Sequence, residues 1–246
     1  MTTLLYETDS YVRDFRAHVM AIDGRRVMLD RSAFFPTGGG QPSDKGALIH
    51  DGVVRAVTDV KRLSGEIWHS YLGPPLPEGK EVMGHIDWQR RFALMRTHTA
   101  LHILSAVVWR DYGRQVTGGD MKPLAGRLDF EFESLDIDIA NAIEKSVNEE
   151  VAAGRAIKVS LMPREEAFRI PDLIRTKINL LPSGMEIVRV VEIVGLDTQA
   201  DSGTHVANTR EVGRIGLIGI ENKGRKNKRL RIELQPSEAV VRELSS

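Results

Sequence analysis

The chain has 246 residues, of which 41% are apolar and 28% charged, and its 34 basic and 34 acidic residues give a formal net charge of zero. This composition is typical of a globular protein with a sizeable core. The sequence has no apolar run of the roughly 18 residues that span a membrane, and its first residues do not resemble a signal peptide. We therefore expect a cytoplasmic protein. Because cysteine is absent, disulfides are excluded and any metal ion must take nitrogen or oxygen ligands.

Short strands separated by turns are predicted in the first third of the chain. Apolar residues alternate there on both sides of two Asp-Gly turns, a pattern that indicates β-hairpins. Strands of this length and spacing favour a small β-barrel, which we assign to a first domain at residues 1–86. The segments are 18–22 and 27–29 around Asp23-Gly24, 47–50 and 53–57 around Asp51-Gly52, and then 67–69 and 82–86.

A long helix is predicted to follow, because the apolar spacing changes at Asp87. Asp87 can cap the first turn, and Gly113 is a plausible end. We therefore begin a second domain at Asp87 and extend it over residues 87–246. The apolar helix positions are Phe92, Met95, Leu101, Leu104 and Val108.

The second domain is predicted to combine helices with a mostly antiparallel sheet, an α+β arrangement. A second helix carries Ile139, Ile143, Val147 and Val151 at four-residue steps and ends near Gly154. The strands expected around it are 128–132, 157–161, 186–193, 215–220 and 230–234.

Three histidines form the best candidate for a chemical site. His98 and His102 are four residues apart and would project from one face of the predicted helix, where two imidazoles can share a metal ion. His205, in a loop far downstream, could supply a third ligand. The pair alone is weak evidence, since helical histidines at this spacing are more often surface or core residues. Thr99 stands where a zinc peptidase has its glutamate base, so that class is poorly supported.

Four segments spread over nearly the whole chain form a specific combination: 34–46 (FFPTGGGQPSDKG), 87–102 (DWQRRFALMRTHTALH), 201–206 (DSGTHV) and 224–232 (GRKNKRLRI). Taken together, they resemble the editing domain of alanyl-tRNA synthetase and its freestanding relatives of the AlaX type. They occur in the family's order, and the length is similar to that of the medium-sized freestanding form.

The resemblance implies a zinc ion (Zn²⁺) held by His98, His102 and His205. Asp201 stands where the family usually has a cysteine ligand, and Ser202 stands where it has a glycine. A carboxylate can ligate zinc, so Asp201 is one candidate for the fourth ligand, and water is the other.

The implied reaction is hydrolysis of the ester that joins a wrong amino acid to tRNA(Ala), with Ser-tRNA(Ala) as the substrate and Gly-tRNA(Ala) as a second candidate. Thr117 lies in the region that resembles the serine-recognising position, although it could simply belong to a turn before a strand. Gly38, Gly39 and Gly40 permit close backbone approach to a ligand, and Gln41 offers donors and acceptors. We expect this loop to contact the terminal adenosine or the aminoacyl group, with Thr117 and Gln41 acting in the reaction.

A basic cluster near the C-terminus is expected to bind the phosphate backbone of tRNA. Because the net charge of the chain is zero, only a local group of cations can attract a polyanion. Arg90, Arg91 and Arg96 would add positive charge near the metal helix, whereas Trp88 and Trp109 are expected to be core anchors. The cluster comprises Lys223, Arg225, Lys226, Lys228, Arg229 and Arg231.

Two other functions stay open at this point. One is a tRNA-binding module that has lost activity through the change at position 201. The other is a metallohydrolase of small esters or peptides, which the basic cluster and the glycine-rich loop disfavour. We expect tRNA(Ala) as the partner, and neither DNA nor a membrane.

Overall fold

The computed structural model describes residues 2–174, 176, 184–224 and 226–235. The chain divides into two compact units, Met1–Phe92 and Ala93–Ser246, and the division falls within the long helix α1, Trp88–Tyr112. Within the described residues, no helix is long and apolar enough to cross a membrane.

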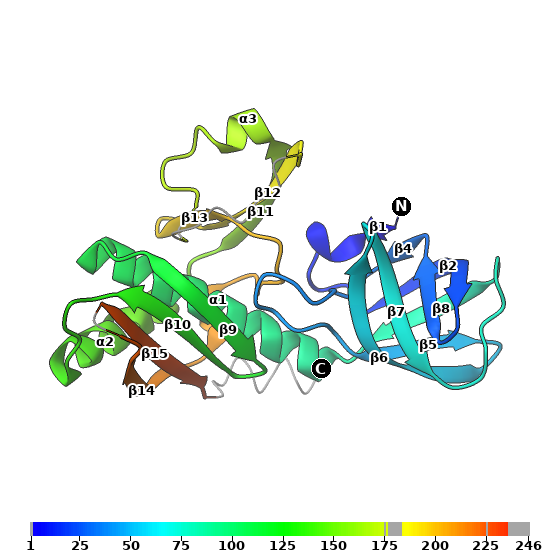
Figure 1. Ribbon diagram of the computed structural model, residues 1–246, viewed down its shortest axis with the longest axis horizontal. Helices are drawn as coiled ribbons and strands as arrows, with labels where there is room; N and C mark the ends of the chain where they lie inside the picture. Colours follow the sequence, from blue (N-terminus) through cyan, green and yellow to red (C-terminus); the bar gives the residue numbers. More distant parts are fainter. Residues whose placement is uncertain (1, 175, 177–183, 225, 236–246) are drawn as a thin grey trace. The chain divides into compact units, whose positions relative to one another are not determined.

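The first unit is built around a closed six-stranded barrel in the order β2-β3-β7-β6-β5-β8 (Figure 1), which confirms the predicted barrel. A short parallel pair, β1 and β4, and the 3-10 turn η1 accompany it. The bounds are β1 Thr3–Leu4, η1 Leu5–Glu7, β2 Asp14–Asp23, β3 Arg26–Leu29, β4 Arg31–Ser32, β5 Gly46–His50, β6 Val53–Leu63, β7 Glu66–Leu72 and β8 Glu81–Ile86.

Tight turns and alternating burial explain why this segment closes into a barrel. Asp51 and Gly52 both have positive φ, 50° and 73°, which is the backbone of the hairpin turn whose twist matches that of the strands. Along β2, Phe15, Ala17 and Val19 are buried while the residues between them are exposed, so one face of the strand fills the barrel core.

Helix α1 begins and ends where its sequence predicts. The Asp87 carboxylate accepts a hydrogen bond from the Arg90 backbone N–H at 3.1 Å, which caps the first turn. Gly113 takes the left-handed conformation, with φ 64°, and its N–H donates to the Trp109 carbonyl at 2.9 Å.

In the second unit, α1 packs against a four-stranded antiparallel sheet in the order β14-β15-β10-β9. A Cβ on Gly126 of β10 would lie 3.2 Å from the Leu101 methyls, so glycine permits the close approach of helix and strand. Helix α2 is capped by Asp136, ends at Gly154, and is fixed to β14 by Asn148, whose amide bonds both backbone groups of Ile215. The bounds are α2 Ile137–Ala153, β9 Val116–Lys122, β10 Ala125–Glu131, β14 Ile215–Asn222 and β15 Asn227–Leu234.

A separate three-stranded antiparallel sheet, β11-β12-β13, completes the second unit. Its buried Val188 and Val190 pack with Leu173 and Ala167, and β13 leads directly into the loop that carries Asp201 and His205. The α+β class is thus confirmed. The bounds are β11 Ile157–Pro163, α3 Arg164–Ala167, β12 Ile187–Ile193, β13 Asp197–Ala200 and η2 Thr209–Val212.

Candidate metal centre

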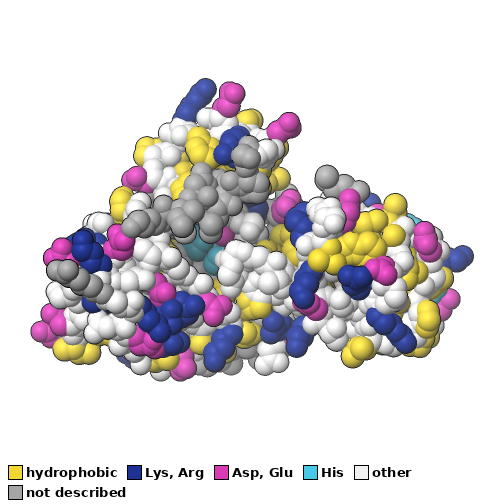
Figure 2. Space-filling model, in the orientation of Figure 1, with side chains coloured by type: hydrophobic (Ala, Val, Ile, Leu, Met, Phe, Trp, Pro, Cys, Tyr) yellow, Lys and Arg dark blue, Asp and Glu magenta, His cyan; other side chains and the backbone are white. Residues whose placement is uncertain are grey.

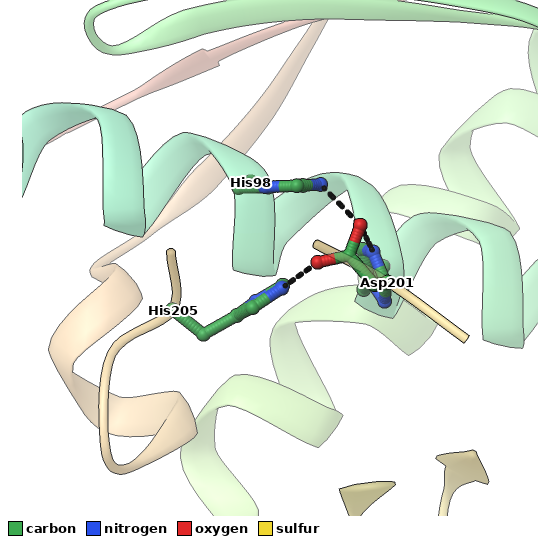
Figure 3. A group of neighbouring side chains, drawn as sticks. His98, Asp201 and His205 are labelled. Atoms are coloured by element: carbon green, nitrogen blue, oxygen red, sulfur yellow. Dashed lines mark hydrogen bonds and ion pairs between the residues drawn. The ribbon is translucent and has the colours of Figure 1, made fainter. Parts of the chain in front are cut away.

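Two elements of the second unit bring three imidazole rings together. His98 and His102 project from one face of α1. His205 comes from the loop after β13, and Figure 3 shows the Asp201 carboxylate between His98 and His205. The ring centroids lie 5.0 Å apart for His98 and His102, 4.6 Å for His98 and His205, and 4.7 Å for His102 and His205. The helical spacing and the distant loop therefore converge on one point, as the sequence predicts.

Asp201 lies among the three rings. Its Oδ1 is 3.5 Å from His98 Nε2 and 3.9 Å from His102 Nε2, and its Oδ2 is 2.9 Å from His205 Nε2. One donor atom from each of the four residues lies within 4.8 Å of the others. The side chains of His98, His102, Asp201 and His205 are only 9%, 11%, 13% and 1% exposed, so the cluster is largely shielded from water.

Backbone contacts hold the Asp201 carboxylate in place. The Asp201 N–H donates to the Arg189 carbonyl at 3.1 Å, and the Arg189 guanidinium donates to the Asp201 carbonyl at 3.0 Å. The Gly203 N–H donates to Asp201 Oδ2 at 2.7 Å, while Arg189 Nη1 lies 3.7 Å from the same oxygen. Oδ2 is thus engaged by the loop, and Oδ1 is the oxygen nearer to the two helical histidines.

The opposite side of the His205 ring is held by α1. Its Nδ1 lies 3.1 Å from the Thr99 hydroxyl oxygen, which also accepts a hydrogen bond from the Val206 N–H at 3.3 Å. All three of these residues are buried. A single hydroxyl of the metal helix therefore contacts the loop that supplies the third imidazole.

Burial and mutual proximity set the charge state of the cluster. Burial lowers the pKa of His98 well below its usual range, and it lowers the pKa of His205 to about 4. For Asp201, burial acts to raise the pKa, but the charge of His98 and the hydrogen bond to His205 outweigh burial and lower it. Near neutral pH, His98 and His205 are therefore neutral imidazoles beside the Asp201 carboxylate anion.

This donor set fits a divalent cation. Imidazole nitrogen and carboxylate oxygen are both zinc ligands, and neutral imidazole is the form that binds metal. Ligands at about 2 Å from a tetrahedral zinc ion lie roughly 3.3 Å apart. The 3.5 and 3.9 Å distances from Asp201 Oδ1 to the two helical histidines approach that separation.

Comparisons with known proteins identify the family. The family model for class II (A) tRNA synthetases matches residues 8–90, and the model for the threonyl and alanyl tRNA synthetase second additional domain matches residues 188–231. The alanyl-tRNA editing protein AlaX-M of Saccharolobus solfataricus is 40% identical over 96% of this chain and its own whole length. The chain belongs to the AlaX-M family of alanyl-tRNA editing proteins.

Other relatives show the same relationship. The AlaX-M protein of Methanosarcina barkeri is 37% identical over 94% of this chain and 98% of its own length. The alanine–tRNA ligase of Pyrobaculum neutrophilum is 37% identical over 89% of this chain, a match that covers 25% of the ligase. The matches thus cover nearly the whole of two freestanding editing proteins and one part of the ligase.

The glycine-rich loop forms a tight turn in the barrel unit. Gly39 and Gly40 have φ of 56° and 84°, which side chains disfavour, and the N–H of Gly38 and the N–H of Gln41 each donate to the other residue's carbonyl. The Gln41 side chain is buried rather than displayed. The proposed contact of this loop with substrate stays a prediction.

A buried ion pair anchors the end of the same loop. Arg91 and Asp44 are both fully buried, and the guanidinium donates to both carboxylate oxygens of Asp44 and to the carbonyls of Ser10 and Ala33. The Asp44 carboxylate also accepts from the Phe35 N–H at 2.6 Å. Asp44 and Arg91 therefore join the two ends of segment 35–44 to the start of α1.

Thr117 lies in a strand and not in a turn before one. It belongs to β9, and its hydroxyl donates to the side-chain oxygen of Asn227 at 2.9 Å. The two glycines that follow disfavour a strand locally, but Gly119 provides room for the Leu128 side chain, because a Cβ there would lie 2.9 Å from it. Packing against β10 therefore decides the conformation.

The structure separates the basic cluster into paired and exposed cations. Lys228 is buried and donates to the Gly224 carbonyl, whereas Lys226 is exposed and Arg225 lies outside the described residues. Arg229 makes a bidentate pair with Asp129 at 2.7 and 2.9 Å. In Figure 2, Lys and Arg side chains gather over β10 and β15 with acidic side chains among them.

The expectation of extra surface charge from the arginines of α1 is wrong for Arg91 and Arg96. Arg91 is neutralised by Asp44 inside the barrel unit. Arg96 is buried and donates to the carbonyls of Val212 and Gln235, and this burial lowers its pKa to about 10. Arg90 donates to the Ser43 carbonyl.

Sequence reasoning missed the two residues that hold the ligand loop, Thr99 and Arg189. Thr99 carries a local signal, since a hydroxyl stands between the two helical histidines in sequence, but the sequence alone does not indicate what that hydroxyl contacts. Arg189 lies in a predicted strand 12 residues before Asp201, and nothing in that spacing indicates that its guanidinium meets the Asp201 carbonyl and carboxylate.

Proposed function

We propose that this chain hydrolyses the ester of mischarged tRNA(Ala), with Ser-tRNA(Ala) as its main substrate and Gly-tRNA(Ala) as the second. Proteins of its family act on tRNA(Ala), and as an alanyl-tRNA editing protein the chain is an aminoacyl-tRNA deacylase. The observation that carries the proposal is the convergence of His98, His102, His205 and Asp201 on one shielded point. A cytoplasmic location stays a prediction.

We infer that the bound metal is zinc. When bound, zinc would polarise the ester carbonyl and help to position the aminoacyl group. His98, His102 and His205 would bind the ion through nitrogen, and Asp201 would supply an anionic oxygen from a loop held by Gly203 and Arg189. The low exposure of these side chains limits access of bulk water, which strengthens electrostatic interactions in the site.

Selectivity against correctly charged alanine requires recognition of one hydroxyl group. An apolar pocket discriminates weakly between serine and alanine, whereas a site that hydrogen-bonds the hydroxyl does much better. Thr117 donates its proton to Asn227, so its oxygen can act as an acceptor toward a serine hydroxyl. We assign Thr117 this role on that chemistry, and Gln41 with Gly38–Gly40 the binding of the aminoacyl-adenosine end.

Phosphate contacts are assigned first to Lys226, with Arg225 beside it in sequence. Lys226 is exposed, and an exposed ammonium can approach a phosphate without breaking a buried contact. Lys228 and Arg229 also belong to the proposed tRNA-binding segment. Their contacts with the Gly224 carbonyl and the Asp129 carboxylate would hold the conformation of that segment.

Deacylation assays with the full chain test the proposal. Ser-tRNA(Ala), Gly-tRNA(Ala) and Ala-tRNA(Ala) are incubated with protein that carries zinc, protein stripped by a chelator, and stripped protein with zinc restored. We expect rapid loss of serine, slower or equal loss of glycine, survival of the alanine ester, and activity that follows zinc.

Two results would contradict it. tRNA binding without turnover of either substrate by the zinc-loaded protein would instead identify an inactive tRNA-binding module. Turnover that is unchanged after complete zinc removal would exclude the metal centre from the reaction. A Thr117→Val variant that still distinguishes serine from alanine normally would remove Thr117 from the selectivity proposal alone.

A further inference from the structure

The Thr99 side chain occupies an unusual position for a threonine in the middle of a helix. Threonine hydroxyls in helices commonly bond the carbonyl of the preceding turn. Thr97 does so, donating to the Ala93 carbonyl at 2.8 Å while accepting from the Leu124 N–H at 2.9 Å. The Thr99 oxygen instead lies 3.1 Å from Nδ1 of His205, a residue 106 positions away.

The contact is made at the ring nitrogen of His205 that does not meet Asp201. His205 Nε2 is directed at Asp201, at 2.9 Å, so Nδ1 is the nitrogen left to be oriented by the protein. The outer nitrogen of a metal-binding histidine usually donates to a partner that fixes the ring and its tautomer. Thr99 occupies the place of that partner, and its side chain is fully buried.

A hydroxyl suits both tautomers that His205 must adopt. When Nε2 carries the proton and donates to Asp201, Nδ1 is an acceptor and needs a donor. When Nε2 binds a metal ion, Nδ1 carries the proton and needs an acceptor. A hydroxyl can serve in either role, whereas a carboxylate or a carbonyl only accepts.

The same oxygen also holds the loop backbone. The Val206 N–H donates to Thr99 Oγ1 at 3.3 Å, immediately after His205 in sequence. One atom of α1 therefore contacts both the ring of the third ligand and the backbone beside it. This links the loop ligand to the helix that carries His98 and His102.

We propose that Thr99 is a positioning residue of the metal centre, whose hydroxyl fixes the His205 ring with Nε2 directed at the cluster. The inference rests on the metal site of the proposed function and adds a determinant of its affinity. It requires that loss of the Thr99 oxygen weakens metal binding even though Thr99 is not a ligand.

The test is the zinc affinity of the full chain, measured by competition with a chromophoric chelator at fixed pH. Thr99→Val keeps the volume and removes the hydrogen-bonding oxygen, and we expect zinc to bind about 10- to 100-fold more weakly, the usual effect of losing such a partner. Thr99→Ser keeps the oxygen and should restore an affinity near that of the wild type. Thr97→Val is the matched control, because it removes another buried hydroxyl of α1 that holds Leu124 rather than a ligand.

Equal affinities of Thr99→Val and wild type would overturn the proposal, and so would equal losses in Thr99→Val and Thr97→Val or a failure of Thr99→Ser to restore binding. Those results leave zinc binding by the wild type intact. Absence of stoichiometric zinc binding by the wild type would instead overturn the proposed function together with this inference.

A measurement on the wild type alone covers the case in which Thr99→Val does not fold. In the zinc-loaded protein, ¹⁵N chemical shifts of the His205 ring should show Nε2 bound to zinc and Nδ1 protonated. Zinc bound through Nδ1 would contradict the proposal, because that nitrogen is the one assigned to Thr99.

Discussion

Each unit of this protein buries a cluster of charged or ionisable side chains, and the two clusters differ in how closely a cation is paired with the carboxylate. In the barrel unit, the Arg91 guanidinium meets the Asp44 carboxylate and two backbone carbonyls, so donors and acceptors are matched. In the second unit, His98, His102 and His205 gather around Asp201, and the buried Arg189 guanidinium lies 3.7 Å from the Asp201 carboxylate. The first cluster is complete as a structural contact, whereas the second has the donors of a cation site.

The largest effect is expected from breaking the matched cluster. Arg91→Leu leaves the Asp44 carboxylate buried without its partner, which should lower the free energy of unfolding by about 3–5 kcal/mol. Urea denaturation followed by fluorescence measures this. The control is Arg90→Leu, which removes a neighbouring, partly exposed arginine bound to one carbonyl, that of Ser43. If Arg91→Leu lowers the free energy of unfolding by less than about 1 kcal/mol, the Arg91–Asp44 pair contributes no more than an ordinary surface ion pair.

The stability conferred by the second cluster should depend on bound metal more than on any one of its side chains. Zinc at 1,000 times its dissociation constant should stabilise the wild type by about 4 kcal/mol, because only the folded chain holds the site together. His98→Phe should lose this stabilisation while keeping, in the presence of a chelator, a stability close to that of the chelated wild type. Thermal unfolding with zinc and with a chelator checks both parts. If His98→Phe in chelator is far less stable than the wild type in chelator, His98 stabilises the fold without metal, and its main role is structural.

A buried histidine in the barrel extends the comparison to pH. His69 is fully buried, with Ser32 Oγ 2.7 Å from Nε2 and the Val27 carbonyl 3.1 Å from Nδ1, and burial lowers its pKa to about 4. Below pH 6.5 the unfolded chain gains a proton that the folded chain does not take up until about pH 4. The contribution of His69 to stability is therefore complete above pH 6.5 and declines toward pH 4, by about 3 kcal/mol in all.

The difference in unfolding free energy between wild type and His69→Gln isolates this effect from other groups that titrate in the same range. We expect His69→Gln to be the less stable protein at pH 7 and the gap to shrink as the pH falls toward 4. A gap that stays constant with pH would show that His69 does not remain neutral in the folded barrel.

The smallest effect on folding is expected at an exposed cation. Lys226→Ala should change the unfolding free energy by less than about 0.5 kcal/mol, as is usual for surface positions. The same change should reduce the slope of log affinity for tRNA against log salt by about 1, if Lys226 contacts a phosphate. Binding measured at several salt concentrations tests this. An unchanged slope would remove Lys226 from the tRNA surface.

Local sequence features predict the structure correctly wherever neighbouring residues determine the backbone conformation. The Asp51-Gly52 turn was predicted because Asp and Gly tolerate positive φ, and it occurs with φ of 50° and 73°. The capped start of α1 at Asp87 and its end at Gly113 follow from the same kind of local chemistry. The strand that carries Thr117 is not predicted from the sequence, because Gly118 and Gly119 disfavour a strand until Leu128 of the neighbouring strand packs over them.

The sequence by itself determined that His98 and His102 share a helix face, because four residues make about one helical turn, and the family resemblance linked them with His205 and Asp201. Only the tertiary structure decided which polar groups are buried and what they meet. Arg91 resembles a surface cation in sequence but is paired with Asp44, 47 residues away, and Thr99 meets His205 across 106 residues. Helical periodicity is fixed by the local backbone, whereas burial and pairing depend on where distant segments pack, and no short stretch of sequence contains that information.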